Sequence, residues 1–255
     1  MARCGPWRAR MLPVAGLATF LAAWWLVVEV FAVPPFIAPS PVLVLETLVD
    51  KRGVLLANLL PTALEAAGGF VLGNLAAALL AAVFVHSAVL RAMLLPVFLL
   101  LNAIPVVAKA PILVLLLGSG FAPKATIAAM VCFFPTLVNT VRGLDAVNPQ
   151  AMDLMRVLSA SPREIFFRLR VFSAVPYLFS ALRISASLCV IGAIVGEWIG
   201  TDVGIGALIL QATYNFDSAL LYAAIVVGSC LSGAFYLVVV AVERLVVRWP
   251  AGTAP

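Results

Sequence analysis

Charge is scarce in this chain. Only 11% of its 255 residues are Asp, Glu, Lys or Arg, and it has a single histidine. Soluble chains contain about 25% charged and about 45–50% apolar residues, whereas 64% of this chain is hydrophobic. Apolar runs of about 18 residues or more are typical of membrane-spanning helices. The composition therefore excludes an ordinary soluble domain and predicts a polytopic membrane protein.

Residue patterns for catalysis or metal binding are missing as well. The sequence has no HExxH, no paired carboxylate motif and no Ser-His-Asp order. Three of the four cysteines lie in apolar segments, and the spacing of all four fits neither a disulfide framework nor a metal site (Cys4, Cys132, Cys189 and Cys230). We expect no catalytic residue, metal or cofactor. The net charge of +5 comes from short basic groups between apolar segments, which is not the pattern of a nucleic-acid partner.

A phosphate-binding loop is also absent. The nearest approach is GSGFAPKAT, Gly118 to Thr126. Pro123 stands where such a loop requires Gly, and Ala125 stands where Ser or Thr would hold magnesium. Any use of ATP and Mg²⁺ is therefore expected in another subunit.

What the sequence has in abundance is long apolar runs, so we expect an all-α fold in one transmembrane domain, 1–255. Six segments are close to the roughly 20 residues that a helix needs to cross a bilayer. They lie near 11–33, 62–85, 92–117, 122–141, 174–199 and 219–247. The first is longer than the apolar part of a signal peptide, about 7–15 residues, so we take it as an uncleaved span. The Pro-broken segment 34–61 is expected to lie at the membrane interface.

The basic residues predict the orientation of these spans. With the N-terminus in the cytoplasm, six alternating helices place 12 of the 16 Lys and Arg on the cytoplasmic side, as the positive-inside rule requires. The other four are Lys51, Arg52, Lys109 and Lys124. Both termini are then expected in the cytoplasm.

One of the cytoplasmic loops is unusually well defined. In NPQAMDLMRVLSASPREIFFRLRVFSAVP, residues 148–176, Asn148-Pro149 is an N-cap followed by Pro, and Ser161-Pro162-Arg163-Glu164 is a capping box. We expect two short helices that meet at a turn. Their apolar faces are Met152, Met155 and Leu158 on the first helix, and Ile165, Phe166 and Leu169 on the second. Such a loop can lie on lipid headgroups or dock into a protein groove, and these residues leave both alternatives open.

The loop resembles the EAA loop of ABC importer permeases. Asp153-Leu154-Met155 occupies the EAA position, and Leu158-Ser159-Ala160-Ser161 occupies the family's L-G-A-S. Four flanking stretches are similar to the nitrate/sulfonate/taurine branch, so the resemblance covers about 30–245: PPFIAPSPVLVLETL, NAIPVVAKAPILVLLLGSG, FFPTLVNTVRGLDAVNP and ALRISASLCVIGAIVGEWIGTDVGIGALIL.

The resemblance implies the type I importer fold, with six transmembrane helices and a cytoplasmic coupling-helix loop at 148–172. It implies a permease homodimer among the lipids of the bacterial inner membrane, a cytoplasmic ABC ATPase dimer, and an extracytoplasmic solute-binding protein. The residues expected to contact the ATPase are Asp153, Leu154, Met155, Leu158, Ser159, Ala160, Ser161 and Pro162. The solute would be small and anionic or polar, such as a sulfonate, taurine, nitrate or a thiamine-pyrimidine precursor. The alternatives are a stand-alone secondary transporter and a membrane assembly protein.

The chain also departs from the family pattern. Asp153 replaces Glu, Ser173 replaces a Pro, and Ser159 replaces a Gly. Because Ser is less free than Gly to adopt a positive φ, we expect either a turn at Ser159 that is built differently or an unusual docking partner.

Candidates for the translocation pathway or gate are Glu197, Lys109, Gly196 and Gly200. Glu197 and Lys109 are candidates because ionisable residues inside apolar spans are costly and often functional, and the glycines because small residues let helices approach closely. Glu197 matches a family Glu, although it can also extend to water at the end of its span. Lys109 lies between two prolines, whose freed carbonyls can accept its protons. Gly192, Gly196 and Gly200 suit either packing within one subunit or a subunit interface. Glu65 is expected to be interfacial.

Overall fold

The computed structural model describes residues 6–199 and 201–247, and every regular element within those ranges is a helix. The helices are α1 (Pro6–Val30), α2 (Pro41–Asp50), α3 (Arg52–His86), α4 (Ala88–Ala103), α5 (Val106–Leu117), α6 (Phe121–Asp145), α7 (Pro149–Val157), α8 (Pro162–Ile165), α9 (Val171–Glu197), α10 (Ile205–Tyr214) and α11 (Ser218–Val246). A π-helical turn, Phe166–Arg170, joins α8 to α9. The all-α prediction is confirmed for the described residues.

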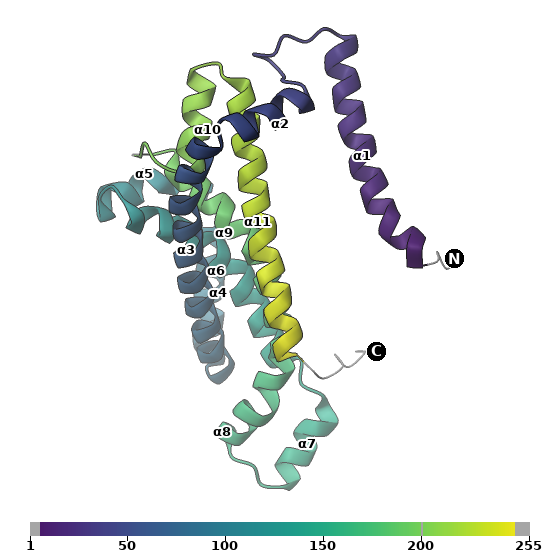
Figure 1. Ribbon diagram of the computed structural model, residues 1–255. Helices are drawn as coiled ribbons and strands as arrows, with labels where there is room; N and C mark the ends of the chain where they lie inside the picture. Colours follow the sequence, from purple (N-terminus) through teal and green to yellow (C-terminus); the bar gives the residue numbers. More distant parts are fainter. Residues whose placement is uncertain (1–5, 200, 248–255) are drawn as a thin grey trace.

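Several of these helices have the length and composition of membrane spans. Five of those in the described ranges are long and apolar enough to cross a bilayer, and the number is six when the bent pair α4–α5 counts as one span. Figure 1 shows α7 and α8 projecting from one end of the molecule and α2 and α10 lying at the other, while α1 stands apart from the bundle. The multi-pass prediction is therefore confirmed.

The core is built around α6, which packs between α3 and α9. Small residues allow this close approach: a Cβ added at Gly73 would overlap the backbone of Ala129, and one added at Gly192 would lie 2.7 Å from the Cα of Ala128. Gly192 and Gly196 thus face α6 of the same subunit. The intrasubunit alternative is correct for these two glycines, whereas Gly200 lies outside the described residues.

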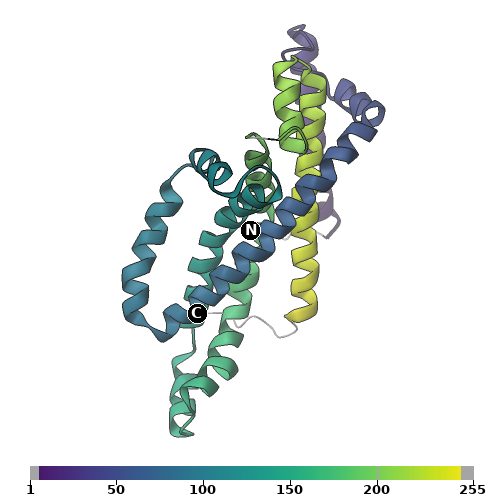
Figure 2. The ribbon, with the colours of Figure 1, turned by 90° about the vertical axis from the view of Figure 1, so that its left-hand side faces the viewer.

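The third predicted span, 92–117, is two helices rather than one. α4 and α5 meet at an angle of 100°. Ile104 and Pro105 between them are both extended, with ψ of 126° and 133°. A residue before proline is disfavoured in the helical region, and Pro105 cannot donate a backbone hydrogen bond. The bend therefore has a local cause. In Figure 2 the pair forms an arch beside α3 and α6.

The interfacial segment predicted at 34–61 is only partly interfacial in form. A short helix does occur there, α2, whose N-cap Ser40 accepts the Leu43 amide at 3.2 Å. Residues 52–61, however, are the first turns of the 35-residue helix α3, and Pro61 lies inside it. A single proline removes only one backbone hydrogen bond, which the long apolar helix tolerates.

The second short helix predicted in the 148–172 loop is not separate from the following span. From Pro162 to Glu197 the chain is one helical rod of 36 residues, with the π-helical turn inside it. π-Helical turns inside α-helices are frequent at functional sites. Loop and span are therefore mechanically continuous.

Candidate functional sites at the two ends of the bundle and the cavity between

The projecting loop exposes apolar side chains on the described surface. Leu154, Val157, Leu158 and Phe167 are each more than half exposed, up to 81% for Val157. By contrast, Ile165, Phe166 and Leu169 form the half-buried inner face, as their spacing predicts. Within the described part of the chain, Asp153 pairs only with Arg156 of its own helix, at 3.1 Å, with both side chains about 70% exposed. The loop thus presents an apolar patch fringed by charge, which we call the loop patch (Leu154, Val157, Leu158 and Phe167).

The two caps predicted in this loop are both present. Asn148 accepts the Gln150 amide at 2.8 Å and begins α7. Ser161 and Glu164 form a reciprocal capping box: the Ser161 amide donates to Glu164 at 2.9 Å, and the Glu164 amide donates to the Ser161 hydroxyl at 3.3 Å. Short-range rules were sufficient here because each cap involves residues no more than three apart.

The turn between the caps corrects the expectation for Ser159. Ser159 has a φ of +54°. Its amide donates to the Arg156 carbonyl at 2.9 Å, and the Ala160 amide donates to the Met155 carbonyl at 3.0 Å. This pair of bonds is a Schellman motif, whose left-handed position favours glycine. Ser159 therefore adopts the conformation that a glycine would adopt, and the turn is not built differently.

The base of the loop is tied to three helices. Asp145, at the end of α6, accepts Arg91 of α4 at 2.6 Å and lies 3.7 Å from Arg170. Arg170 also donates to the Leu144 carbonyl at 3.2 Å. On the other side, the ring of Phe166 lies 4.7 Å from that of His86 at the end of α3. A displacement of the loop therefore acts on α3, α4 and α6 as well as on α9.

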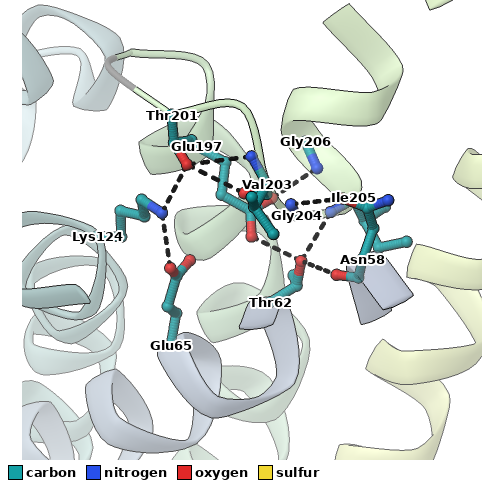
Figure 3. Close-up of polar contacts among 10 residues, drawn as sticks. All are labelled: Asn58, Thr62, Glu65, Lys124, Glu197, Thr201, Val203, Gly204, Ile205 and Gly206. Carbon is teal, nitrogen blue, oxygen red and sulfur yellow. Dashed lines mark hydrogen bonds and ion pairs between the residues drawn. The ribbon is translucent and has the colours of Figure 1, made fainter. Parts of the chain in front are cut away.

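At the opposite end of the bundle, Glu197 lies in a buried polar cluster (Figure 3). Glu197 is 0% exposed. Its Oε1 accepts the Thr62 hydroxyl at 2.6 Å, and its Oε2 accepts the Gly206 amide at 2.5 Å, in the first turn of α10. A carboxylate is favoured there because the first amides of a helix lack partners within it. The interpretation in which Glu197 extends to water is wrong.

Two more residues of the cluster hold the start of α10. The Thr62 oxygen accepts the Ile205 amide at 2.8 Å, and Asn58 accepts the Gly204 amide at 2.8 Å. Gly204 has a φ of +121°, and a Cβ added there would overlap the Glu197 carboxylate. The contact between Glu197 and α10 thus depends on a glycine at this position.

The second half of the cluster is an ion pair. Lys124 of α6 donates to Glu65 of α3 at 2.8 Å, and both side chains are less than 10% exposed. Lys124 also donates to Thr201 at 3.1 Å. The expectation that Glu65 is interfacial is wrong, because α3 begins ten residues earlier than expected and carries Glu65 into the core. The sequence signal was present, since a Glu and a Lys within apolar helices each need a partner.

Lys109 is placed apart from this cluster. It lines a cavity of about 460 Å³ between the α4–α5 arch and helices α3 and α6. The expectation that carbonyls freed by the two prolines accept its protons is wrong, since Lys109 makes no hydrogen bond or ion pair within the described ranges. Gly196 instead packs near Lys124 and Ile127. Among the described candidates, Lys109 therefore lies apart from Glu197 and Gly196.

Taken with the bundle, the projecting loop and the buried cluster define a class of protein, a multi-pass helical transport component. A family model for "binding-protein-dependent transport system inner membrane component" matches residues 69–251. The chain belongs to this family. It is the permease component of an ABC transport system, a non-catalytic transport subunit.

The chain is also similar to named relatives over most of its length. It is 34% identical to the riboflavin transport system permease protein RibX of Chloroflexus aurantiacus, over 96% of this chain and 92% of the relative. It is 33% identical to the formylaminopyrimidine transport permease protein ThiX of Halalkalibacterium halodurans, over 84% and 86%. A Bacillus subtilis protein named for aliphatic sulfonates transport, SsuC, is 24% identical over 97% and 89%. These relatives fit the branch that the sequence motifs indicated.

Proposed function

We propose that this chain is the membrane subunit of an ATP-driven importer, with its 148–172 loop docked into a separate cytoplasmic ATPase. The observation that carries the proposal is the loop patch at the end of a helix that continues into the bundle. Exposed apolar side chains fringed by charge suit a groove on a protein partner. ATP and Mg²⁺ would be used by that partner.

The proposed orientation places the loop in the cytoplasm. Arg91, Arg156, Arg163 and Arg170 gather at the end where α7 and α8 project (Figure 1), while Lys51 and Arg52 lie at the start of α3 at the other end. The positive-inside rule then assigns the loop end to the cytoplasm. Both termini would be cytoplasmic, in a bacterial inner membrane. A solute-binding protein would meet the face that carries α2 and α10.

The proposed mechanism uses the anchoring of the loop. Closure of the ATPase pair would move the loop, and Asp145, Arg170 and Phe166 would pass that movement to α3, α4 and α6. Glu197 stays a candidate for holding the outer gate, because it joins the far end of α9 to α10. A homodimer would complete the pathway between two copies of the chain.

The proposed solute is small and polar or anionic. The relatives named above are assigned to riboflavin, formylaminopyrimidine and aliphatic sulfonates. These three kinds of solute share polar or charged groups on an organic skeleton, and we extend that class of solute to this chain.

The test is docking of the ATPase. Leu158→Asp puts a charge into the loop patch at a side chain that is 67% exposed, so folding is preserved while co-purification of the ATPase and ATP hydrolysis by the complex are lost. Phe36→Asp, an equivalent change at the opposite end, is the control and leaves both unchanged. A photo-cross-linking residue at Asp153 or Ala160 should capture the ATPase. Capture of lipid alone, together with solute uptake that needs no ATPase, would support a secondary transporter instead.

A further inference from the structure

The cavity beside the α4–α5 arch is built by four helices. Its lining includes Gly73 and Ala76 of α3, Phe98 and Asn102 of α4, Lys109 of α5 and Phe133 of α6. The volume of about 460 Å³ lies within the range of about 300–1,000 Å³ for small-molecule sites. The bend at Ile104–Pro105 turns α5 by 100° from α4, and the cavity lies between this arch and helices α3 and α6.

The walls of the cavity are aromatic. Phe98 and Phe133 pack against each other, with ring centroids 5.2 Å apart and planes inclined by 47°, and both line the cavity together with Phe134 and Met130. Rings and thioethers make favourable contacts with flat aromatic groups. The small side chains of α3 leave the opposite wall smooth. This surface favours a planar ring over a compact tetrahedral ion alone.

One charge enters this apolar space. Lys109 is the sole ionisable residue in the cavity wall, and it has no counter-charge within the described ranges. An unpaired ammonium in an apolar site is costly unless an anion neutralises it. Asn102 adds an amide that can donate a hydrogen bond to the same anion. The lining thus combines one cation and one amide donor with three aromatic rings.

We propose that this cavity is a substrate site for a small planar aromatic or heteroaromatic molecule that carries one anionic group. Lys109 holds the anionic group, and Phe98 and Phe133 hold the ring. The proposal rests on the proposed function, of which it names the substrate class. A lipid tail would fill the apolar volume but leave Lys109 unpaired, and charge complementarity therefore favours the aromatic anion.

The test is photolabelling of the full chain in native membrane vesicles without ATP, so that it succeeds or fails independently of the ATPase. The probes are 4-azidobenzoate and its neutral isostere 4-azidobenzamide, and labelled residues are mapped by mass spectrometry. We expect 4-azidobenzoate to label the cavity wall at Phe98, Met130 or Phe133. Lys109→Gln should lower that labelling by about tenfold, the loss typical of one charge-assisted hydrogen bond.

Matched controls separate binding from folding. Lys109→Arg keeps the charge and should retain labelling. Lys51→Gln removes a lysine outside the cavity and should leave labelling of the cavity unchanged. Labelling by 4-azidobenzamide should be the same in Lys109→Gln as in the natural chain, which shows that the cavity is intact. Equal labelling by both probes, unchanged in Lys109→Gln, would overturn the proposal. So would displacement of the probe by an acyl-chain photolipid.

Discussion

The two ends of this bundle use polar residues in opposite ways. At the loop end, the side chains of Asp153 and Arg156 are 70% and 71% exposed, and those of Arg91 and Asp145 are 38% and 42% exposed. At the other end, Glu65, Lys124 and Glu197 are buried and bind one another's helices. Exposed pairs contribute little to stability, whereas buried ones are costly to break. The loop end is suited to meet a partner, and the buried cluster is suited to fix helices in place.

The largest effect should come from unpairing the buried charge. Lys124→Met leaves Glu65 without its cation, and we expect a loss of about 3–5 kcal/mol in the free energy of unfolding. The measurement is the unfolding midpoint in SDS titration of detergent-solubilised protein. The double variant Glu65→Met with Lys124→Met should recover most of that loss, because neither charge stays buried. If the double variant is as unstable as the single one, the ion pair is not the cause.

A second variant tests the contact between Glu197 and α10. Gly204→Ala places a Cβ on the Glu197 carboxylate and imposes a φ of +121° on an alanine. Gly118→Ala is the matched control, since Gly118 also has a positive φ, +77°, in the same extended mirror region, but has open space around it. The backbone strain alone costs about 1–3 kcal/mol, so the control loses that much and Gly204→Ala loses more. Equal thermal midpoints for the two variants would contradict the geometry of the cluster.

At the loop end the expected change is smaller and of opposite sign. Ser159→Gly removes the cost of a left-handed serine, about 1–2 kcal/mol, less the entropy that glycine loses, about 0.5–1 kcal/mol. The loop turn should be stabilised by up to about 1.5 kcal/mol, a factor of about ten in the opening equilibrium. Slower hydrogen exchange of the Ala160 amide is the measurement. Ser159→Ala keeps a Cβ and should leave the exchange rate unchanged.

The smallest effect concerns the ion pair between Lys51 and Asp217 at the cluster end, 2.6 Å apart. The hydrogen bond from Lys51 lowers the pKa of Asp217 below its ordinary 3.8. The pair therefore stabilises the fold fully above pH 3.8, and this stabilisation is lost as the pH falls through the lowered pKa of Asp217. The two side chains are 42% and 33% exposed, so screening limits the contribution to under about 1 kcal/mol.

Asp217→Asn tests this pair. Asp217 also caps α11 by accepting the Leu220 amide, and asparagine keeps a cap. The unfolding midpoints of the natural chain and Asp217→Asn should differ slightly at pH 7 and converge as the pH falls below 3.8. Asp217→Ala, which loses the cap as well, should stay lower at every pH. A gap between the natural chain and Asp217→Asn that persists in acid would show that the charge is irrelevant.

The comparison also shows what the sequence could predict. The caps at Asn148 and Ser161 follow from residues that are neighbours in the chain, and both are present. The partner of Glu65 is 59 residues away, and nothing in the local pattern selects Lys124 over Lys109. The bend at Pro105 had a local signal, but the long apolar run from 92 to 117 favoured one span. The apolar spans other than 92–117 and the loop caps were thus predictable, and the pairing of buried charges was not.

The length of α3 has a consequence for the surrounding lipid. Its 35 residues rise about 52 Å, against a hydrocarbon thickness of about 30 Å. Such an excess is accommodated by slant and by turns that protrude, and Figure 2 shows α3 lying obliquely across the molecule. The same helix carries Thr62 of the buried cluster and Gly73 of the cavity lining. We therefore expect a change in bilayer thickness to affect both the cluster and the cavity. Reconstitution in short- and long-chain phospholipids would reveal it as a paired change in cavity labelling and in hydrogen exchange at Gly206.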